Sequence, residues 1–434
     1  MKRSRGKRLG ITARRRSCLS RTIPREGRQR GSIAIQIAIL LAVLLGFASL
    51  GIEIGILLWT SRQMQTAADG AAYDAAMARM HGYPVHFATE ATTLAAAAGF
   101  VNGENGTTVL VNDPPEEGIY AGDSDAVEVI ISEPQNPVLA SLFKSGPWQL
   151  SARSVALLDI NAVACILALD PSAVAAVTLR NNAVVTTPDC AVAANSTAAG
   201  ALTLDNNATI DGAVNVTGSW TLSNNAAING NPALEYAAPI ADPYAGLALP
   251  SPLPACTGQN ASAGNSGTLD LSPGNFCNGW KIGNGGTINL AAGTYYLAGG
   301  LRLGNQVTIN GTAGVTIVIT DGAAITIDNG TRLAVTAPGP ASGEPFPGIA
   351  IMGLGGPENV TQVFSNNASL DIEGALYFPQ QIIDLENSTE TAAGGCTQVI
   401  GWIVILGNDV QVESNCSAVG TDPLLFATAV KLVE

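Results

Sequence analysis

Asparagine recurs at nearly regular intervals from about residue 161 onward, next to short runs of β-branched residues. The recurring positions fall into three groups: Asn182, Asn207 and Asn225; Asn284, Asn305 and Asn329; and Asn367, Asn387 and Asn408. Within each group the intervals are 18–25 residues, and self-similarity at such a period is typical of solenoids. Asparagine suits the corners of a coil because it tolerates left-handed backbone angles, and stacked asparagines form a side-chain amide ladder. The pattern predicts an all-β, right-handed parallel β-helix over residues 161–434.

Two proline-rich segments interrupt this pattern, near residues 231–255 and 337–347. Proline lacks the N–H group that a strand donates to its neighbour, so we expect both segments to leave the coil as excursions. With ~22 residues per coil, the rest of the region predicts about ten or eleven coils stacked ~4.8 Å apart.

Six of the seven cysteines lie in this region, at spacings that match the coil. Pairing sequence neighbours gives three bridges: Cys165–Cys190, Cys256–Cys277 and Cys396–Cys416. The partners are 25, 21 and 20 residues apart, and sites one coil apart stack within the Cα distance that a disulfide accepts. Pairing between the clusters would join sites many coils apart, which a rod forbids. The seventh cysteine, Cys18, lies alone near the N-terminus, so we expect the six others in an oxidising compartment.

Residues 31–52 contain no charge and are apolar on every helical face. At 1.5 Å per residue, a helix of this length crosses a hydrocarbon core of roughly 30 Å. Residues 1–30 carry 12 basic side chains and one acidic side chain. The positive-inside rule therefore predicts a cytoplasmic tail at residues 1–30, a single transmembrane helix at residues 31–59 and export of the remainder. A cleaved signal peptide is the alternative, although its apolar core is shorter, about 7–15 residues.

Between the membrane helix and the β-helix, the sequence predicts an α+β segment over residues 60–160. The first helix is expected to continue to Met80, and a second helix is expected at residues 88–100, before a cluster of turn residues. Strands are expected at residues 107–111, 126–131 and 148–158, each bounded by proline or glycine. A long helix that leads into a small sheet is the plan of a pilin-like unit.

The same part of the chain resembles a known family. The letters RGSIAIQ at residues 30–36, an acid late in the helix at Glu53, and RQMQTAADGAAYDAA at residues 62–76 resemble the N-terminal module of TadE/TadG-like proteins of Flp (tight adherence) pilus assembly. The likeness covers about residues 30–160. It implies a bitopic protein of the bacterial inner membrane, with a periplasmic or surface-exposed C-terminal domain and other Tad/Flp secretion and pilus-assembly proteins as partners.

Two residues of the membrane helix are singled out by this resemblance as contacts with a partner. Gln36 stands where a pilin-type processing site has an acid, so we expect the mature protein to keep residues 1–30. Glu53 is expected either to reach lipid headgroups or to pair with a cation or main-chain amine of a partner helix, because unmatched intramembrane acids are costly.

Charge and residue types argue against two classes of function. Residues 31–434 carry 9 basic and 33 acidic side chains, a net charge of −24, which disfavours nucleic-acid binding. Polysaccharide-cleaving β-helices need a calcium-binding acid cluster with a basic residue, or paired acids with histidine. Residues 161–434 contain no histidine and five basic residues, none of which lies beside another cation or a tight acid cluster in the sequence: Arg180, Lys281, Arg302, Arg332 and Lys431.

No enzyme activity, metal or other cofactor is therefore expected. Asp170 is similar to the first ligand of a D-x-S-x-S metal loop, but Val174 replaces the second serine, so a capped turn is expected there. The favoured hypothesis is a non-enzymatic envelope protein that works by protein–protein contact. The alternatives are a membrane-tethered β-helix that binds or cleaves polysaccharide, and a surface adhesin.

Overall fold

The computed structural model describes residues 32–82, 86–138, 141, 145–257, 261–356, 360–391, 395–414 and 421–434. These residues form two helices, α1 (Ser32–Met80) and α2 (Phe87–Ala97), and 28 strands. The chain divides into two compact units. The first contains Met1–Trp59 and Asn136–Pro147, and the second contains Thr60–Gln135 and Trp148–Glu434.

In the first unit, α1 presents apolar side chains on all sides. Most large apolar side chains from Ile33 to Trp59 are 42–69% exposed. Water would penalise such a surface, whereas lipid acyl chains would not. The helix is long and apolar enough to cross a membrane, as the sequence predicts.

The second unit begins with the rest of α1, which packs with α2 against a four-stranded antiparallel sheet. In spatial order, the strands are β1 (Thr108–Asn112), β2 (Ala126–Gln135), β3 (Trp148–Ala168) and β28 (Leu424–Leu432). The helix side of this core consists mostly of alanines, with Met64 and Met80 at its two ends: Ala67, Ala68, Ala71, Ala72, Ala75 and Ala76. At Gly70 an added Cβ would lie 2.7 Å from Leu94 Cδ2, so a side chain there would have to displace the Leu94 side chain. The expected helices and the first three strands are present, whereas β28 has no counterpart among the expected elements.

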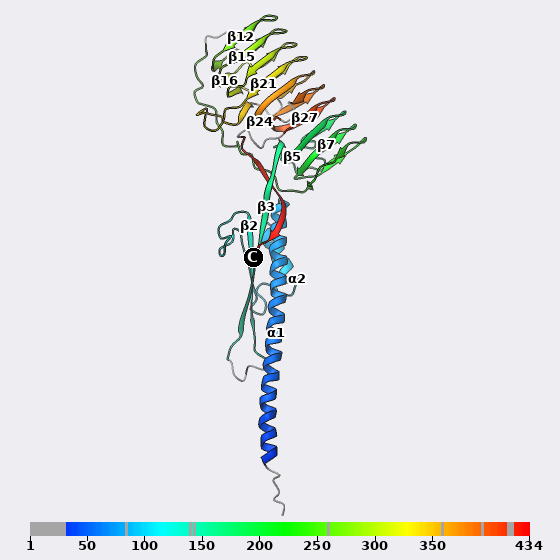
Figure 1. Cartoon of the computed structure of the whole chain (residues 1–434), viewed down its shortest axis with the longest axis vertical. Helices are drawn as coiled ribbons and strands as arrows, with labels where there is room; N and C mark the ends of the chain where they lie inside the picture. Colours follow the sequence, from blue (N-terminus) through cyan, green and yellow to red (C-terminus); the bar gives the residue numbers. More distant parts are fainter. Residues whose placement is uncertain are drawn as a thin grey trace, which may run out of the picture. The chain divides into compact units, whose positions relative to one another are not determined.

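Strand β3 continues from this sheet into the next part of the unit. Its first half pairs with β2, its middle pairs with β28, and its last residues join the parallel strands that follow (Figure 1). The boundary expected at residue 160 therefore lies inside a strand. Arg153 on β3 forms ion pairs with Glu128 and with Glu434, which ties the end of the chain to the α+β sheet.

The remaining strands form a β-solenoid of about 10 turns. They stack in parallel in three columns, and each turn supplies one segment to each column. The first column contains β11 (Ser262–Ala263), β14 (Trp280–Ile282), β17 (Leu301–Leu303), β20 (Ile325–Ile327), β23 (Thr361–Phe364), β24 (Ser369–Glu386), β26 (Thr397–Gly407), β4 (Val177–Arg180), β6 (Leu202–Asp205) and β8 (Trp220–Leu222).

The second column contains β12 (Thr268–Leu271), β15 (Thr287–Leu290), β18 (Thr308–Gly311), β21 (Arg332–Thr336), β24, β25 (Glu390–Thr391), β27 (Gln411–Glu413), β5 (Val184–Ala194), β7 (Thr209–Val216) and β9 (Ala227–Ile228). The third contains β13 (Gly274–Phe276), β16 (Gly293–Leu297), β19 (Val315–Ile319), β22 (Ile349–Gly353), β24, β26, β3, β5, β7 and β10 (Ala233–Glu235). The long strands β24, β26, β5 and β7 bend at corners and so contribute to more than one column.

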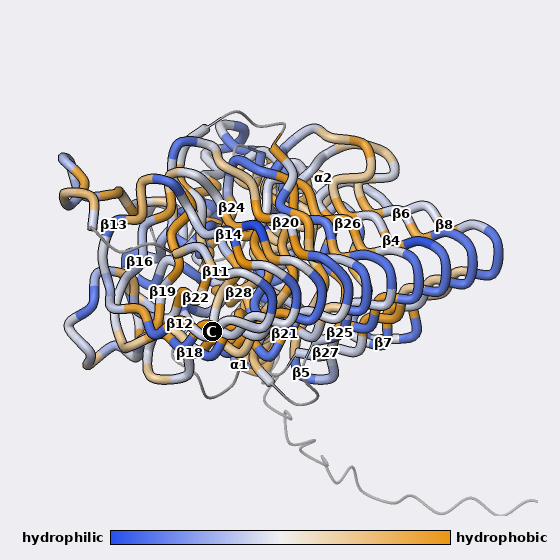
Figure 2. Tube along the Cα trace, turned by 90° about the horizontal axis from the view of Figure 1, so that it is seen from above, coloured by the Kyte–Doolittle hydropathy of each residue, from blue (hydrophilic) through white to orange (hydrophobic). Residues whose placement is uncertain are grey.

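The turns are not stacked in chain order. The chain enters the solenoid through β3. It then adds turns in one direction up to β10, which belongs to the last turn at that end. It then restarts at β11 at the opposite end and winds back until β26 pairs with β3 and β4. In Figure 1 the orange and red strands accordingly end beside the green ones, and Figure 2 shows β8, β6, β4 and β26 in this order along the stack. The junction joins residues distant in sequence, such as Thr178 and Ile405.

The proline-rich segment after β10 makes the passage between the two ends. Ile240 and Tyr244 of this segment are buried in an apolar cluster on the outer face of the third column. The hydroxyl of Tyr377 donates a hydrogen bond to Asp242 (2.8 Å), and the amide of Asn195 donates to and accepts from the backbone of Ile240 (2.8 Å each). This segment therefore leaves the coil, as predicted, but packs along it.

The third column is consequently buried on both faces. Phe346, from the second proline-rich segment, is 2% exposed in the same cluster. Strands buried on both faces read as continuous apolar runs rather than alternating ones. The five residues each of β19 and β22, VTIVI and IAIMG, are all buried.

The asparagine corners have the expected geometry around the junction. Asn181, Asn206 and Asn387 have φ angles of 54°, 52° and 56°. Amide hydrogen bonds run from Asn206 to Asn181 (3.0 Å), from Asn181 to Asn408 (2.7 Å) and from Asn408 to Asn387 (3.1 Å). The predicted amide ladder is confirmed around the junction, which it crosses without a break. The expected Asn207 and Asn182 are joined in the same way (3.1 Å).

The corners between β11 and β21 use a variation of this geometry. There the left-handed residue follows the asparagine, as at Gly285 and Gln306 (φ 67° and 57°). The Asn284 side chain accepts a hydrogen bond from the backbone N–H of Asn305 (2.9 Å). The ladder in these turns is therefore between side chain and backbone.

We expect Asn206→Ala to lower the free energy of unfolding by about 1–2 kcal/mol, because it places a Cβ without a compensating polar group at positive φ and removes one ladder hydrogen bond. Asn206→Gly should cost less, since glycine adopts this φ freely. Urea unfolding of the detergent-solubilised chain, followed by tryptophan fluorescence, measures the difference. Equal losses for the two variants would contradict the role of the left-handed corner.

Candidate functional site

Disulfides close single turns of the solenoid. Cys165 is bonded to Cys190 and Cys256 to Cys277, with Cα atoms 5.7 Å apart in each pair, and both are pairings that the spacing predicts. Cys396 is also disulfide-bonded, and its predicted partner, Cys416, lies outside the described residues.

Two of the cysteine clusters lie on neighbouring turns, closer together than the sequence predicts. The Sγ atom of Cys190 lies 3.5 Å from the carbonyl oxygen of Ser414, because β27 stacks directly on β5. The expectation that the rod separates clusters by many coils is therefore wrong at this point. The reason is the winding order, which brings the last turn against the first.

The same junction assembles a cluster of three charged side chains. Arg180 on β4 forms an ion pair with Glu386 on β24, across the intervening strand β26. Gly407 lies in register between them, and an added Cβ there would be 3.0 Å from Arg180 Cγ and 3.1 Å from Glu386 Oε1. The guanidinium can cross β26 because this position carries no side chain.

Asp384 is the third member, two residues before Glu386 on β24. Among the described residues its Oδ1 atom is buried and has no hydrogen-bond partner. Burial raises the pKa of Asp384 to about 6, the nearby Glu386 carboxylate adds to the rise and Arg180 opposes it. The hydrogen bond with Glu386, partly offset by burial, raises the pKa of Arg180. Arg180 lies beside no acid cluster in the sequence, and the fold alone brings it to acids more than 200 positions away.

This cluster leads to a pH prediction. Because the folded carboxyl of Asp384 holds its proton more tightly than an ordinary carboxyl does, its contribution to stability falls as the pH rises from about 4 to about 6. Above about pH 6 the charged form carries the full penalty, which solvent screening of this partly exposed group reduces to about 1 kcal/mol. Asp384→Asn should therefore stabilise the chain at pH 8 and change little at pH 4. Thermal unfolding at both pH values measures this, and equal stabilisation at both would contradict the assigned cause.

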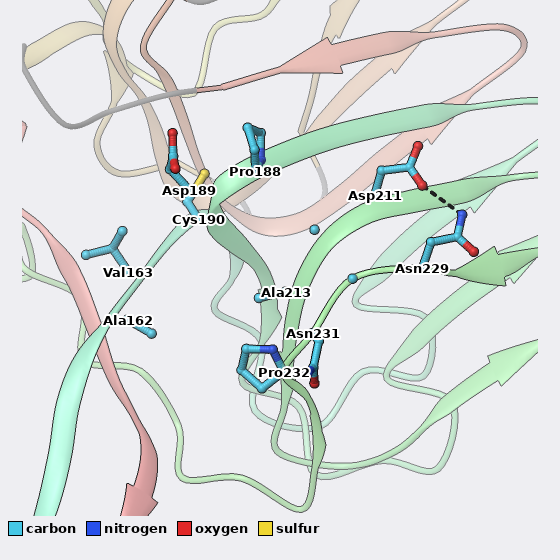
Figure 3. Close-up of a pocket in the computed structure, with 12 residues that line it drawn as sticks. Ala162, Val163, Pro188, Asp189, Cys190, Asp211, Ala213, Asn229, Asn231 and Pro232 are labelled. Atoms are coloured by element: carbon cyan, nitrogen blue, oxygen red, sulfur yellow. Dashed lines mark hydrogen bonds between the residues drawn. The ribbon is translucent and has the colours of Figure 1, made fainter.

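A surface pocket of about 470 Å³ lies at the bend of β5 and β7. It contains two acids, Asp189 and Asp211, and its lining includes no basic side chain. Asn229 donates a hydrogen bond to Asp211 (2.7 Å), and Figure 3 shows the Asp189 carboxylate directed away from Asp211. Hydrolysis by two acids needs carboxyl groups that flank one bond, and these two do not face each other.

A second, shallower groove of about 410 Å³ contains two cations. Lys281 on β14 and Arg302 on β17 are in-register neighbours, with Thr326 on the next turn. Within the described part of the chain neither forms an ion pair, whereas the other three basic residues of the solenoid region do. Lys281 and Arg302 are not neighbours in the sequence, and the fold brings them together because their separation of 21 residues corresponds to one turn.

The turn at Asp170 is a capped turn, as predicted. Asp170 Oδ1 accepts hydrogen bonds from the backbone N–H groups of Ser172 and Ala173 (2.8 Å each). No group of three or more possible metal-binding side chains occurs in the described ranges.

The two residues expected to contact a membrane partner differ in environment. Gln36 is exposed on α1. Glu53 is 5% exposed and accepts a hydrogen bond from the backbone N–H of Val138 (2.9 Å). Contact with a partner helix stays a prediction for both, and nothing in the sequence near residue 138 identifies it as a neighbour of Glu53.

Fold and site together define a class of protein: a β-solenoid joined to an α+β unit and to one helix long and apolar enough to span a membrane. No protein-family model, curated protein or solved structure matches this chain. The functional proposal therefore depends on the geometry of the chain itself.

Proposed function

We propose that this chain is a non-enzymatic, membrane-anchored envelope protein of the TadE/TadG type, which displays a disulfide-stapled solenoid for contact with other proteins of Tad/Flp pilus assembly. Its helix crosses the bacterial inner membrane once, with residues 1–30 in the cytoplasm. The solenoid is periplasmic or surface-exposed. In this proposal residues 60–160 are a pilin-like unit and the solenoid is a right-handed β-helix.

The observation that carries the proposal is the continuity of α1. The helix runs without a break from its exposed apolar part into the buried alanines between Ala67 and Ala76. The sheet that covers these alanines shares β3 with the solenoid. A helix that continues from an apolar stretch into buried alanines suits a protein that holds a binding surface at the membrane.

Topology is tested by thiol labelling in intact cells. Cys18 should react with a membrane-impermeant maleimide only after the inner membrane is opened. In a Cys18→Ser background, an Asn231→Cys variant should react once the outer membrane alone is permeable, because Asn231 is exposed on the solenoid. Protection of position 231 until cell lysis would refute the exported solenoid.

Partner identity is tested by chemical cross-linking in native membranes, followed by purification of the tagged full chain. Recovery of pilus secretion and assembly components is the expected result. Recovery of polysaccharide without such components would contradict the proposal and support the second candidate.

That second candidate is binding of an acidic polysaccharide by Lys281 and Arg302. Its support is the pairing of the two unmatched cations at one-turn spacing in a groove. Polygalacturonate should bind the chain, and Lys281→Ser with Arg302→Ser should abolish binding. Arg332→Ser is the control, because Arg332 is already paired with Asp371. Equal loss in the control would show nonspecific charge attraction and refute the site.

A further inference from the structure

The pattern of exposure around Glu53 is the reverse of that on a water-facing protein surface, where charged side chains are exposed and apolar ones are buried. Between Ile33 and Trp59 it is the one charged residue of α1, and in this described stretch it is also the one buried side chain, at 5% exposed. Its neighbours Ile52 and Ile54 are 57% and 47% exposed. A helix that hides its carboxylate and exposes its isoleucines is organised for a lipid environment rather than for water.

Val138, in the connection between β2 and β3, contacts this carboxylate. The backbone N–H of Val138 donates a hydrogen bond to Glu53 Oε1 (2.9 Å), and Val138 and Glu53 belong to the same compact unit. The Val138 side chain is 64% exposed, so the connection presents an apolar side chain outward while its backbone points to the helix.

The position of Glu53 along α1 sets the depth of this contact. The exposed apolar surface continues beyond Glu53 through Ile56 and Leu58 to Trp59. Six residues of helix correspond to about 9 Å, and tryptophan is enriched at the membrane–water interface. With Trp59 at the interface, Glu53 lies below it, inside the apolar layer, and Val138 must lie at the same depth.

Non-helical backbone is tolerated at such a depth only where its polar groups are satisfied. Glu53 supplies an acceptor for the N–H of Val138, and the N–H supplies a donor for the carboxylate. The two described residues at the contact are suited to lipid: Pro137 and Val138 carry apolar side chains. Pro137 also has no N–H group that would need an acceptor.

We infer that Pro137 and Val138, in the connection between β2 and β3, lie in the bilayer and contact lipid acyl chains, with Glu53 as the acceptor that holds them there. The chain then meets the membrane through two elements, α1 and this connection. The inference depends on the proposed membrane anchoring by α1.

Nitroxide labels on the full chain in phosphatidylcholine nanodiscs test the inference, in a Cys18→Ser background. The label is placed at Val138→Cys, Leu58→Cys or Thr221→Cys, and its collisions with oxygen and with a water-soluble nickel chelate are measured by electron paramagnetic resonance. We expect the Val138 label to show oxygen collisions at least as frequent as those of the Leu58 label, and nickel collisions at least as rare, because Val138 lies deeper than Leu58. The Thr221 label, on an exposed position of β8, should show the reverse.

A Val138 label that matches Thr221 while Leu58 remains in lipid would overturn the inference and leave the anchor intact. A Leu58 label in water would instead refute the anchor itself. The role of Glu53 is tested by Glu53→Leu, which should transfer the Val138 label to water because the acceptor is lost. Glu53→Gln keeps a carbonyl acceptor of similar size and should keep the label in lipid. An unchanged Val138 label in Glu53→Leu would remove Glu53 from the inference.

Discussion

Cysteines introduced as Thr178→Cys and Ile405→Cys should form a disulfide in nearly every molecule on oxidation, although 227 positions separate them in the sequence. The two residues are in-register neighbours on β4 and β26, and neighbouring parallel strands lie ~4.8 Å apart, within the distance that a disulfide accepts. Both side chains are partly exposed on the outer face of the first column. Non-reducing electrophoresis and peptide mapping of the Cys18→Ser chain measure the product.

The matched control pairs Ile405→Cys with Thr203→Cys, one turn farther along the same column. At about 9.6 Å this pair is too far apart to bond directly. A chain wound in sequence order would place residues 178 and 405 many turns apart and would bond neither pair. Bonding of the control but not of the test pair would contradict the junction between β26 and β4.

Phe426→Ala should destabilise the second unit by about 3–5 kcal/mol, the usual cost of deleting a buried phenylalanine side chain. Phe426 on β28 is 6% exposed and lies in the apolar cluster that joins β3, the third column and the segment crossing between the solenoid ends. Since each turn of a solenoid is held chiefly by its neighbours, a cavity at this point weakens the junction on both sides. Thermal unfolding and limited proteolysis of the crossing segment, residues 236–256, measure the effect.

The control is the adjacent residue on the same strand. Leu425 is 48% exposed, so Leu425→Ala should change stability by less than about 0.5 kcal/mol. Similar losses in the two variants would show that β28 contributes through its backbone pairing alone.

Sequence reasoning succeeds where the interacting groups are close in the chain. The two helices, the first three strands, the asparagine corners and the Cys165–Cys190 pairing all depend on separations of one turn or less. The capped turn at Asp170 is local as well. These features follow from residue type and spacing, and they do not depend on how distant parts of the chain are arranged.

The candidate sites were less predictable. Lys281 and Arg302 could be found by applying the turn length of 21 residues to the basic positions. The cluster of Arg180, Glu386 and Asp384 could not, because it exists only where two distant turns meet. The hydrogen bond between Val138 and Glu53 spans 85 positions, and no periodicity connects its two residues.

The sequence by itself determined that this chain forms coils whose length equals the interval between the recurring asparagines. It also determined that disulfides close coils and that an apolar helix precedes them. Only the tertiary structure decided which coil stacks on which. The physical reason is that the stacking interactions are alike in every turn. Backbone hydrogen bonds do not distinguish one strand from another. The side-chain hydrogen bond from Asn181 to Asn408 across the junction (2.7 Å) has the same chemistry as that from Asn206 to Asn181 (3.0 Å), which joins turns that follow each other in the chain. The order of turns is set instead by the crossing segment, by β28 and by the few charged contacts that form only when β26 meets β4.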